Sequence, residues 1–418
     1  MTKKEKSSHS KDSNNFIERR SASKTTKACY NAISQPKTGL VLTGGGARAA
    51  YQVGVLKAIS KIIFKNYCGN PFPIVTGTSA GAINAAVIAS YAHAPAVGIR
   101  SLEKVWQNFS VDQVFRSDFR GLVKNTARWT TSIFVKDYHK SRQLSLLNNN
   151  PLSRLLDRVI HYENIQKAID AKQLDALCIT ASGYTSGQSV SFFQAKEGIA
   201  GWKRHRRVGC RSSIERKHLL ASSAIPMVFP AVPINREFFG DGSVRFLSPL
   251  SPAIHLGADR ILVVGVDPIR QELERHSGEV FYPTIADIAG HVLDSVFVDS
   301  LDSDMERIAR INKTLGLIPK DILQQESKLK PIKTLSISPS KDLSELSGKH
   351  FKELPALVKF FFRRIGIDDD EGSTVLSYLL FERSYTQELL DLGFSDAMAM
   401  QQDIIEFFAG SDSLRPVE

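Results

Sequence analysis

Residues 77–81 form the pattern Gly-x-Ser-x-Gly, between a short apolar run and a stretch of small residues. This pattern is typical of a nucleophile elbow, in which a sharp turn from strand to helix exposes the serine hydroxyl. It predicts Ser79 as a nucleophile, with Gly77 and Gly81 allowing close backbone packing on either side. A tight turn without chemistry is the alternative that the pattern alone leaves open.

A nucleophilic serine needs donors for the oxyanion, and a second glycine-rich loop offers them. Gly44, Gly45 and Gly46 follow the apolar run 38–43, and Gly46 lies two positions before Arg48. Backbone N–H groups at such a junction of strand and helix form an anion site. We expect an oxyanion hole here, with Arg48 either holding the loop or meeting a lipid phosphate.

The same loop also fits the dinucleotide fingerprint G-x-G-x-x-G/A over residues 44–49. That fingerprint requires an acidic residue about 20 positions downstream for the ribose. No Asp or Glu lies between Glu18 and Glu103. The oxyanion hole is therefore the better interpretation of the loop.

A serine nucleophile also needs a base. Residues 238–242 are two phenylalanines followed by Gly-Asp-Gly, so Asp241, next to Gly242, is a candidate. An ordinary turn explains an Asp-Gly pair equally well. A triad in the order Ser–Asp–His, as in other α/β-hydrolases, is a further possibility. The histidines downstream of Asp241 are His255, His276, His291 and His350, and His255 has the surroundings of a helix residue.

The apolar runs around these motifs alternate between strand-like and helix-like patterns. At this spacing the alternation predicts parallel βαβ units, and therefore an α/β fold with a mainly parallel central sheet. The predicted strands cover residues 38–43, 74–76, 174–181 and 260–266, and the predicted helices cover 49–64 and a segment that begins near Ser79.

Composition divides the chain into three parts. Residues 1–36 are rich in Ser, Lys, Thr and Asn, which predicts a disordered basic tail. Residues 37–268 contain all the motifs and form the predicted catalytic domain. Residues 269–418 have mostly helical patterns, with one strand expected at 333–337 and a turn at 368–372, and we expect them to pack on the catalytic domain.

Charge and cysteine content exclude several classes of protein. The formal net charge is +11, but residues 1–37 alone hold nine Lys or Arg against three acids. Because the excess lies mainly in the tail and no recognition motif is present, we expect no nucleic-acid partner. The four cysteines lie far apart and lack metal-ligand spacing, so neither a disulfide framework nor a metal site is expected.

The sequence also gives expectations about location. Its polar start has no apolar core of the kind found in a secretory signal. The most apolar stretch, 80–99, carries Asn84, His93 and Pro95, which suits a packed helix better than a membrane span. We expect a cytoplasmic protein without a transmembrane segment.

Together, the glycine loop, the serine motif and the Asp-Gly pair resemble the patatin-like phospholipase family. The resemblance covers roughly residues 38–268, with every motif in the family's order. The segments that carry it are 40–48 (the oxyanion motif), 77–81 (the serine elbow), 221–230, 241–242 (the acid motif) and 248–253.

The resemblance implies a three-layer α/β/α sandwich and a catalytic dyad without histidine, with Ser79 as nucleophile and Asp241 as base. It also implies hydrolysis of lipid acyl esters, as by a phospholipase A or lysophospholipase, with no metal or cofactor. Two positions depart from the family pattern: Ala49 replaces a usual Gly, and Ser243 stands where Gly or Ala is common. Both residues are small, so we expect the loop geometry to be kept.

Two further segments bear on the substrate, which we expect to be a phospholipid or lysophospholipid. Residues 202–217 hold seven Lys or Arg and form either a basic rim for anionic headgroups or a solvated loop. Residues 357–365 are aromatic and basic, and either rest on a membrane interface or pack in the core. A peripheral membrane surface is thus an expected partner, and a non-catalytic membrane-binding module on the same scaffold is the remaining alternative.

Overall fold

The computed structural model describes most of the chain between residues 36 and 409. The predicted tail, up to residue 35, and the turn expected at 368–372 lie outside the described residues. The described ranges are 36–114 (except 66 and 68), 145, 147–245, 248–268, 282, 284–297, 299–319, 329–364, 366–367 and 373–409.

A ten-stranded sheet forms the centre of the molecule, in the order β10-β9-β1-β2-β3-β4-β6-β5, with β8 also paired to β3 and β7 paired to β8. The strands expected from the apolar runs are all present within a few residues. The strands are β1 (Thr38–Leu42), β2 (Ile74–Thr78), β3 (Ala176–Gly183), β4 (Ser189–Ala195), β5 (Trp202–Arg204), β6 (Arg207–Arg211), β7 (Val232–Ile234), β8 (Glu237–Asp241), β9 (Arg260–Val264) and β10 (Lys333–Ile337).

Half of the sheet is parallel and half is not. Strands β10, β9, β1, β2 and β3 run in one direction. Strands β4 and β8 are antiparallel to β3, and β6 runs parallel to β4. Strands β1, β2, β3 and β9 are buried along their whole length, as expected for parallel strands covered on both faces, whereas the edge strand β10 is only partly buried. The antiparallel half is built from hairpins that the periodicity argument did not predict.

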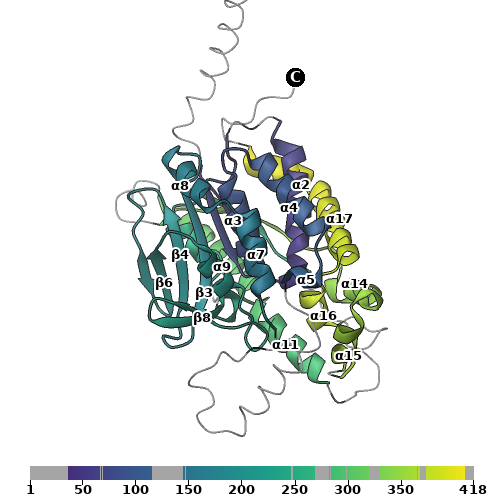
Figure 1. The fold of residues 1–418 in the computed structure, drawn as a ribbon. Helices are drawn as coiled ribbons and strands as arrows, with labels where there is room; N and C mark the ends of the chain where they lie inside the picture. The colour runs from purple at the N-terminus through teal and green to yellow at the C-terminus, as the bar shows by residue number, and fades with distance from the viewer. Residues whose placement is uncertain are drawn as a thin grey trace, which may run out of the picture.

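Helices cover both faces of the sheet (Figure 1). The 3₁₀ turns are η2 (Gly46–Ala49), η4 (Gly242–Arg245) and η5 (Phe351–Glu353). The α-helices are α2 (Ala50–Ile63), α3 (Ala80–Ser90), α4 (Pro95–Gln107), α5 (Val111–Val114), α7 (Asn150–Val159), α8 (Tyr162–Asp170), α9 (Arg216–Ser222), α10 (Ser251–His255), α11 (Ile285–Phe297), α12 (Asp299–Leu315), α14 (Leu343–Lys349), α15 (Ala356–Arg364), α16 (Thr374–Leu379), α17 (Arg383–Ala399) and α18 (Gln401–Phe408).

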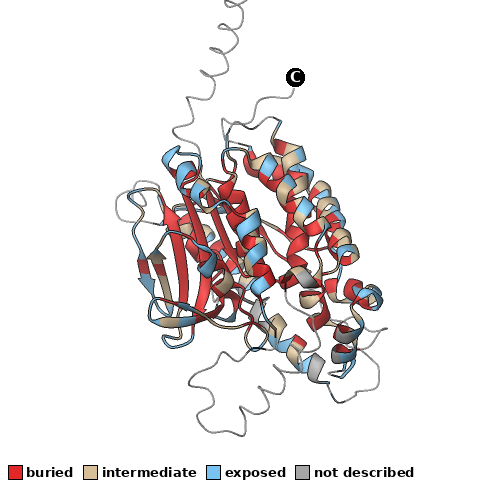
Figure 2. Ribbon diagram, in the orientation of Figure 1, coloured by how far each residue is buried: buried red, intermediate tan, exposed pale blue. Residues whose placement is uncertain are grey.

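Alternate residues of the central strands enter two separate cores. Leu40 and Leu42 pack with the helices on one face, including α2, α3 and α17. Val41, between them, packs on the other face with side chains of α10 and α12. Figure 2 shows the buried strands enclosed by helices that are buried on their inner sides and exposed on their outer sides. The predicted three-layer α/β/α sandwich is therefore confirmed.

The part of the chain after residue 268 is continuous with this core. Strand β10 extends the parallel sheet beside β9. Helix α17 crosses α2 so closely that a Cβ on Gly54 would clash with the Leu390 carbonyl oxygen, and one on Gly393 with that of Tyr51. Glycines allow such contact because they have no side chain. The boundary at 268/269, like that at 36/37, stays a prediction.

The aromatic and basic segment of α15 is buried on one side only. Val358 and Phe362 pack in the core, whereas Phe360 is 58% exposed. Within the described part of the chain, no helix combines the length and apolar character needed to cross a bilayer.

Candidate active site

The turn between β2 and α3 holds Ser79 in a conformation that side chains seldom adopt. Its φ angle is 54°, in the left-handed range that costs a non-glycine residue energy. The flanking glycines allow the turn. A Cβ on Gly77 would lie 2.5 Å from the Gly81 carbonyl oxygen, and one on Gly81 would clash with the carbonyl of Thr43. This is the strained strand–turn–helix geometry of a nucleophile elbow.

Strand β8 meets β2 end to end beside β3. Thr78 pairs with Thr180 of β3, and Asp241, from the opposite direction, pairs with Ala181, the next residue along. The two strands share one side of β3 because β4 occupies the other. The last residue of β8 therefore faces the residue after β2. Ser79 Oγ donates a 2.6 Å hydrogen bond to Asp241 Oδ2.

Asp241 is completely buried. Its other oxygen, Oδ1, accepts a 2.9 Å hydrogen bond from the Ser243 backbone N–H. Burial raises the pKa of Asp241 from 3.8 to about 6, although the hydrogen bonds from Ser79 and Ser243 act in the opposite direction. The carboxyl group is thus poised to change protonation near neutral pH, as a catalytic base requires.

The residue directly after Asp241 has no room for a side chain. A Cβ on Gly242 would clash with the Thr180 carbonyl oxygen, so the chain leaves β8 only through a glycine. Ser243, one of the two departures from the family pattern, is buried and serves through its backbone N–H. Ala49, the other departure, is also fully buried.

The glycine loop packs directly against the serine elbow. A Cβ on Gly81 would lie 2.5 Å from the Leu42 carbonyl oxygen, at the start of the loop. Gly46 has a φ of 54°, and a Cβ there would clash with the Tyr378 carbonyl oxygen. Gly46 lines the same pocket as Ser79. The predicted site segments, 44–46, 77–81 and 241–242, thus come together.

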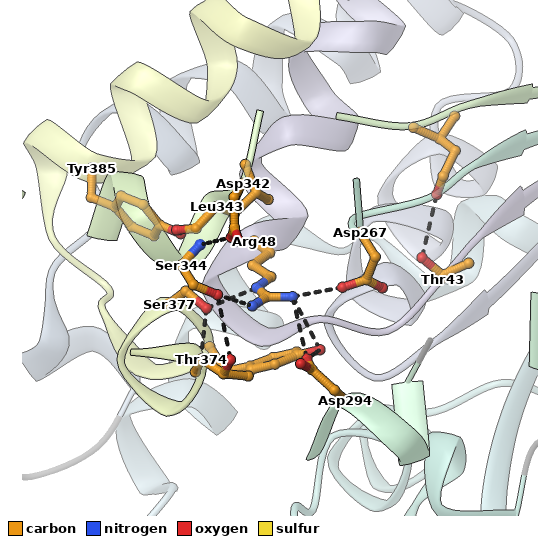
Figure 3. A network of polar contacts seen from close by, with 12 residues as sticks. Thr43, Arg48, Asp267, Asp294, Asp342, Leu343, Ser344, Thr374, Ser377 and Tyr385 are labelled. Carbon is orange, nitrogen blue, oxygen red and sulfur yellow. Dashed lines mark hydrogen bonds and ion pairs between the residues drawn. The ribbon is translucent and has the colours of Figure 1, made fainter. Parts of the chain in front are cut away.

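Arg48 does not face solvent, because it is only 3% exposed. Its Nη1 lies 2.6 Å from Asp267 Oδ1, and its Nε donates to Ser377 Oγ at 2.8 Å. Nη2 donates to Ser344 Oγ at 3.0 Å, and the guanidinium lies 4.1 Å from the centre of the Tyr378 ring. Figure 3 shows Asp267, Ser344 and Ser377 converging on Arg48.

The network around Arg48 bears on the two roles that the sequence allowed. Burial favours the neutral guanidinium, but Tyr378 and Asp267 outweigh this effect and raise the pKa of Arg48. The charged group is thus fully engaged inside the protein. Of the two expected roles, the structure supports holding the glycine loop rather than meeting a lipid phosphate.

Two serines of residues 221–230 join the site. Ser222 Oγ accepts a 2.9 Å hydrogen bond from the Ser79 backbone N–H and donates one of 2.6 Å to the Thr180 carbonyl. Ser223 Oγ is buried and lacks a hydrogen-bond partner among the described residues, and Ser223 lines the pocket at Ser79. Sequence reasoning gave neither a role, because only the three-dimensional contact with the elbow identifies them.

A narrow, almost entirely apolar pocket opens beside Ser79. Its walls come from α3, α4, α5, α7 and the turn after α9, with Phe381 contributed by the chain beyond residue 268. The aromatic rings of Phe109 and Phe381 are 5.5 Å apart. Such a pocket with few polar groups suits an apolar ligand. Its lining includes Ile83, Leu102, Trp106, Leu156, Phe229 and Phe381.

Two of the histidines downstream of Asp241 have other partners in the described structure, and His276 lies outside the described residues. His255 lies on α10, as expected of a helix residue, and its Nδ1 is 2.8 Å from the Ser251 carbonyl oxygen. His350 lies between Glu353 and Glu388. Within the described ranges, no group of three His, Cys, Asp or Glu side chains is arranged to hold a metal ion.

Comparison with known proteins identifies the family. Residues 40–254, about half of the chain, match the model of the patatin-like phospholipase family. The chain belongs to this family, and its membership supports lipid hydrolase activity. No curated protein sequence matches the chain significantly.

Solved structures resemble the chain only distantly. Human GIVD cytosolic phospholipase A2 aligns over 94% of this chain and 64% of its own, with 10% identity and a TM-score of 0.43. VipD from Legionella pneumophila aligns over 89% of this chain and 68% of its own, with 12% identity and a TM-score of 0.29.

Replacing the buried cation is expected to destabilise the fold. Arg48→Met removes the buried cation that lies 2.6 Å from Asp267, so we expect the free energy of unfolding to fall by about 3–5 kcal/mol. Arg48→Lys keeps the charge but loses the planar set of guanidinium donors, so we expect an intermediate effect. Urea unfolding measures both, with Arg100→Met, an exposed position on α4, as the matched control. A loss no larger than in the control would contradict a structural role for Arg48.

Removing the charge of Asp241 is expected to stabilise the protein at alkaline pH. Because its pKa is raised when folded, the stability that Asp241 contributes is complete below about pH 4 and lost as the pH rises through 6. The Asn side chain of Asp241→Asn cannot ionise. The stability of this variant relative to wild type is therefore expected to rise by roughly 2 kcal/mol between pH 4.5 and pH 8, and its melting temperature relative to wild type rises with it. Thermal unfolding at the two pH values measures this. An unchanged difference would contradict the raised pKa.

Proposed function

We propose that the protein is a lipid acyl hydrolase that cleaves carboxylic esters through a dyad of Ser79 and Asp241. The 2.6 Å hydrogen bond from Ser79 Oγ to the buried carboxylate carries this proposal. Asp241 takes the hydroxyl proton while Oγ bonds to the ester carbonyl carbon. The tetrahedral intermediate then expels the alcohol, which takes the proton from Asp241. Water hydrolyses the acyl-enzyme by the same steps, again with Asp241 as base.

The oxyanion hole belongs to the loop of Gly44, Gly45 and Gly46. This loop follows β1 and lies beside the serine elbow, and Gly46 lines the pocket at Ser79. Backbone N–H groups fixed before the reaction stabilise the developing negative charge without reorganisation. The Arg48 network and the Tyr378 backbone hold the loop from behind, which supports this assignment.

The apolar pocket supports a substrate with a fatty acyl chain. The pocket starts at Ser79, and its lining is apolar apart from two serines. An acyl chain bound there places its ester carbonyl at the pocket mouth, beside Ser79. A phospholipid or lysophospholipid fits this arrangement, and the reaction requires no metal or cofactor in this scheme.

Two other functions were open from the sequence. A Ser–Asp–His triad is disfavoured because Asp241 Oδ2 bonds Ser79 directly, while His218, on α9, is fixed by Glu215 in a capping box. Burial also lowers the pKa of His218 to about 4. A non-catalytic membrane-binding module would have no need of a strained serine paired with a buried acid.

The dyad is tested by labelling with a fluorescent fluorophosphonate, which reacts with activated serines. We expect wild type to be labelled, Ser79→Ala to be silent, and Asp241→Asn to react at least 100-fold more slowly, since a positioned base contributes about 10²–10⁴-fold. Ser90→Ala, at the far end of α3, is the matched control. Normal labelling of folded Ser79→Ala would refute the assignment of the nucleophile.

The pH dependence of the reaction separates the dyad from a triad. Because Asp241 acts only when ionised and its pKa is about 6, we expect kcat/KM for a water-soluble ester to fall about tenfold per unit below pH 6. The rate is measured between pH 4.5 and 8.5, with Ser79→Ala as the background. A curve that keeps this midpoint after each of His218, His255, His276, His291 and His350 is replaced by Asn supports the dyad. Loss of activity in one of these variants favours a triad.

A further inference from the structure

The turns of the antiparallel half of the sheet project from the same edge as Ser79. Gly183 N–H bonds the Gln188 carbonyl in the β3–β4 turn, and Ser189 N–H bonds the Arg206 carbonyl in the β5–β6 turn. Tyr184 N–H bonds the Phe238 carbonyl, so the β7–β8 turn reaches beyond the end of β3. Each turn extends past the level of Ser79, which is set by the pairing of Thr78 with Thr180.

The dimensions of a sheet place these turns around the site. The β5–β6 turn lies three strands from the line shared by β2 and β8, which is roughly 14 Å at about 4.8 Å per strand. Ala181 pairs with Asp241, and Phe238 lies opposite Tyr184, three residues further along the chain from Ala181. At about 3.3 Å per residue, Phe238 is therefore roughly 10 Å further out than Asp241. Ser79 thus lies beneath a rim formed by three turns.

This rim is strongly basic. We define the rim as residues 184–188, 203–207, 235–238 and 244–245, which include six Lys or Arg and one acid, Glu237. Glu237 accepts a hydrogen bond from the Ser186 backbone N–H. Arg206, Arg236 and Arg245 are exposed. Residues 202–211 of the basic segment 202–217 form the β5–β6 hairpin, whose turn belongs to the rim, whereas Arg216 and Lys217 lie on α9. Arginines from elsewhere in the chain join this turn in the rim.

The rim also exposes apolar side chains. Tyr184 is 55% exposed, Phe238 51% and Val244 39%. The Tyr184 side chain packs over Gly240, the residue before Asp241. Met227, 58% exposed, lies in the turn whose Ile225 and Phe229 line the apolar pocket. Apolar side chains that are interspersed with arginines characterise a surface that contacts both the acyl and the headgroup regions of a bilayer.

We propose that this rim docks on the surface of an anionic phospholipid bilayer, with its arginines on the headgroups and Phe238 entering the interface. The inference rests on the proposed function only in that docking brings the Ser79 pocket to its substrate. A nucleic acid offers the same phosphate charge, and its unpaired bases can stack on aromatic rings, but it has no apolar phase for an aliphatic side chain such as Val244. The observations therefore favour a lipid surface.

Vesicle flotation in a Ser79→Ala background tests the proposal without hydrolysis. The vesicles contain phosphatidylcholine alone or with 30% phosphatidylserine. We expect binding to the mixed vesicles, weaker binding to phosphatidylcholine, and loss at high salt as charges are screened. Arg206→Glu combined with Arg236→Glu, from two different turns, is expected to weaken binding at least tenfold. Phe238→Ser is expected to weaken it severalfold.

The controls lie at the opposite edge of the sheet. Lys167→Glu combined with Lys172→Glu changes the net charge by the same amount as the two rim substitutions. Lys167 lies on α8 and Lys172 between α8 and β3. Lys172 also has a positive φ, like Arg206. Leu317→Ser, 81% exposed near the start of β10, matches Phe238→Ser. Both controls are expected to bind like the parent.

A second measurement separates this inference from the proposed function. With Ser79 intact, the Arg206→Glu, Arg236→Glu variant is expected to hydrolyse a water-soluble ester at the wild-type rate but anionic vesicles at least tenfold more slowly. Vesicle binding without any ester hydrolysis would refute the proposed function and leave the docking surface standing. Equal binding by the rim and control variants, or binding to DNA without binding to vesicles, would overturn the docking surface.

Discussion

The hydrogen bond between Ser79 and Asp241 depends on one constraint, the end-to-end meeting of β2 and β8 along a single side of β3. Once β4 occupies the other side, the register brings the last residue of β8 against the residue after β2. The glycines on either side follow from this closeness, since a Cβ on Gly242 would clash with β3 itself. The sheet thus positions the pair without a long flexible side chain.

Two buried ionisable groups, Asp241 in the site and Arg48 behind the glycine loop, are accommodated by the fold in opposite ways. Asp241 has no cation among its hydrogen-bond partners in the described structure, so burial raises its pKa to about 6. Arg48 keeps its charge because Asp267 lies 2.6 Å away and hydroxyl groups surround it. The first arrangement provides a base that can accept a proton. The second provides a fixed support for the glycine loop, because moving Arg48 away from Asp267 would leave buried charges uncompensated.

Sequence reasoning found the parts of the site that are local in the chain. The elbow serine, the glycine loop and the parallel strands each lie within one short segment, where spacing and periodicity carry the information. Long-range contacts were not predictable in this way. Arg48 meets Ser377, 329 positions later, and Ser222 meets Ser79 across 143. The β5–β6 hairpin was missed for a related reason, because a short hairpin with exposed basic residues resembles a solvated loop.

The two halves of the sheet contribute differently to the site. Parallel strands are joined by helices, and those helices cover the pocket beside Ser79 with apolar side chains. Antiparallel strands are joined by tight turns, so the other half of the sheet ends at the same edge in exposed hairpins. One side of Ser79 is therefore enclosed and apolar, and the other is open and basic. An ester with an apolar chain and an anionic headgroup matches this division, since each end meets an environment of its own polarity.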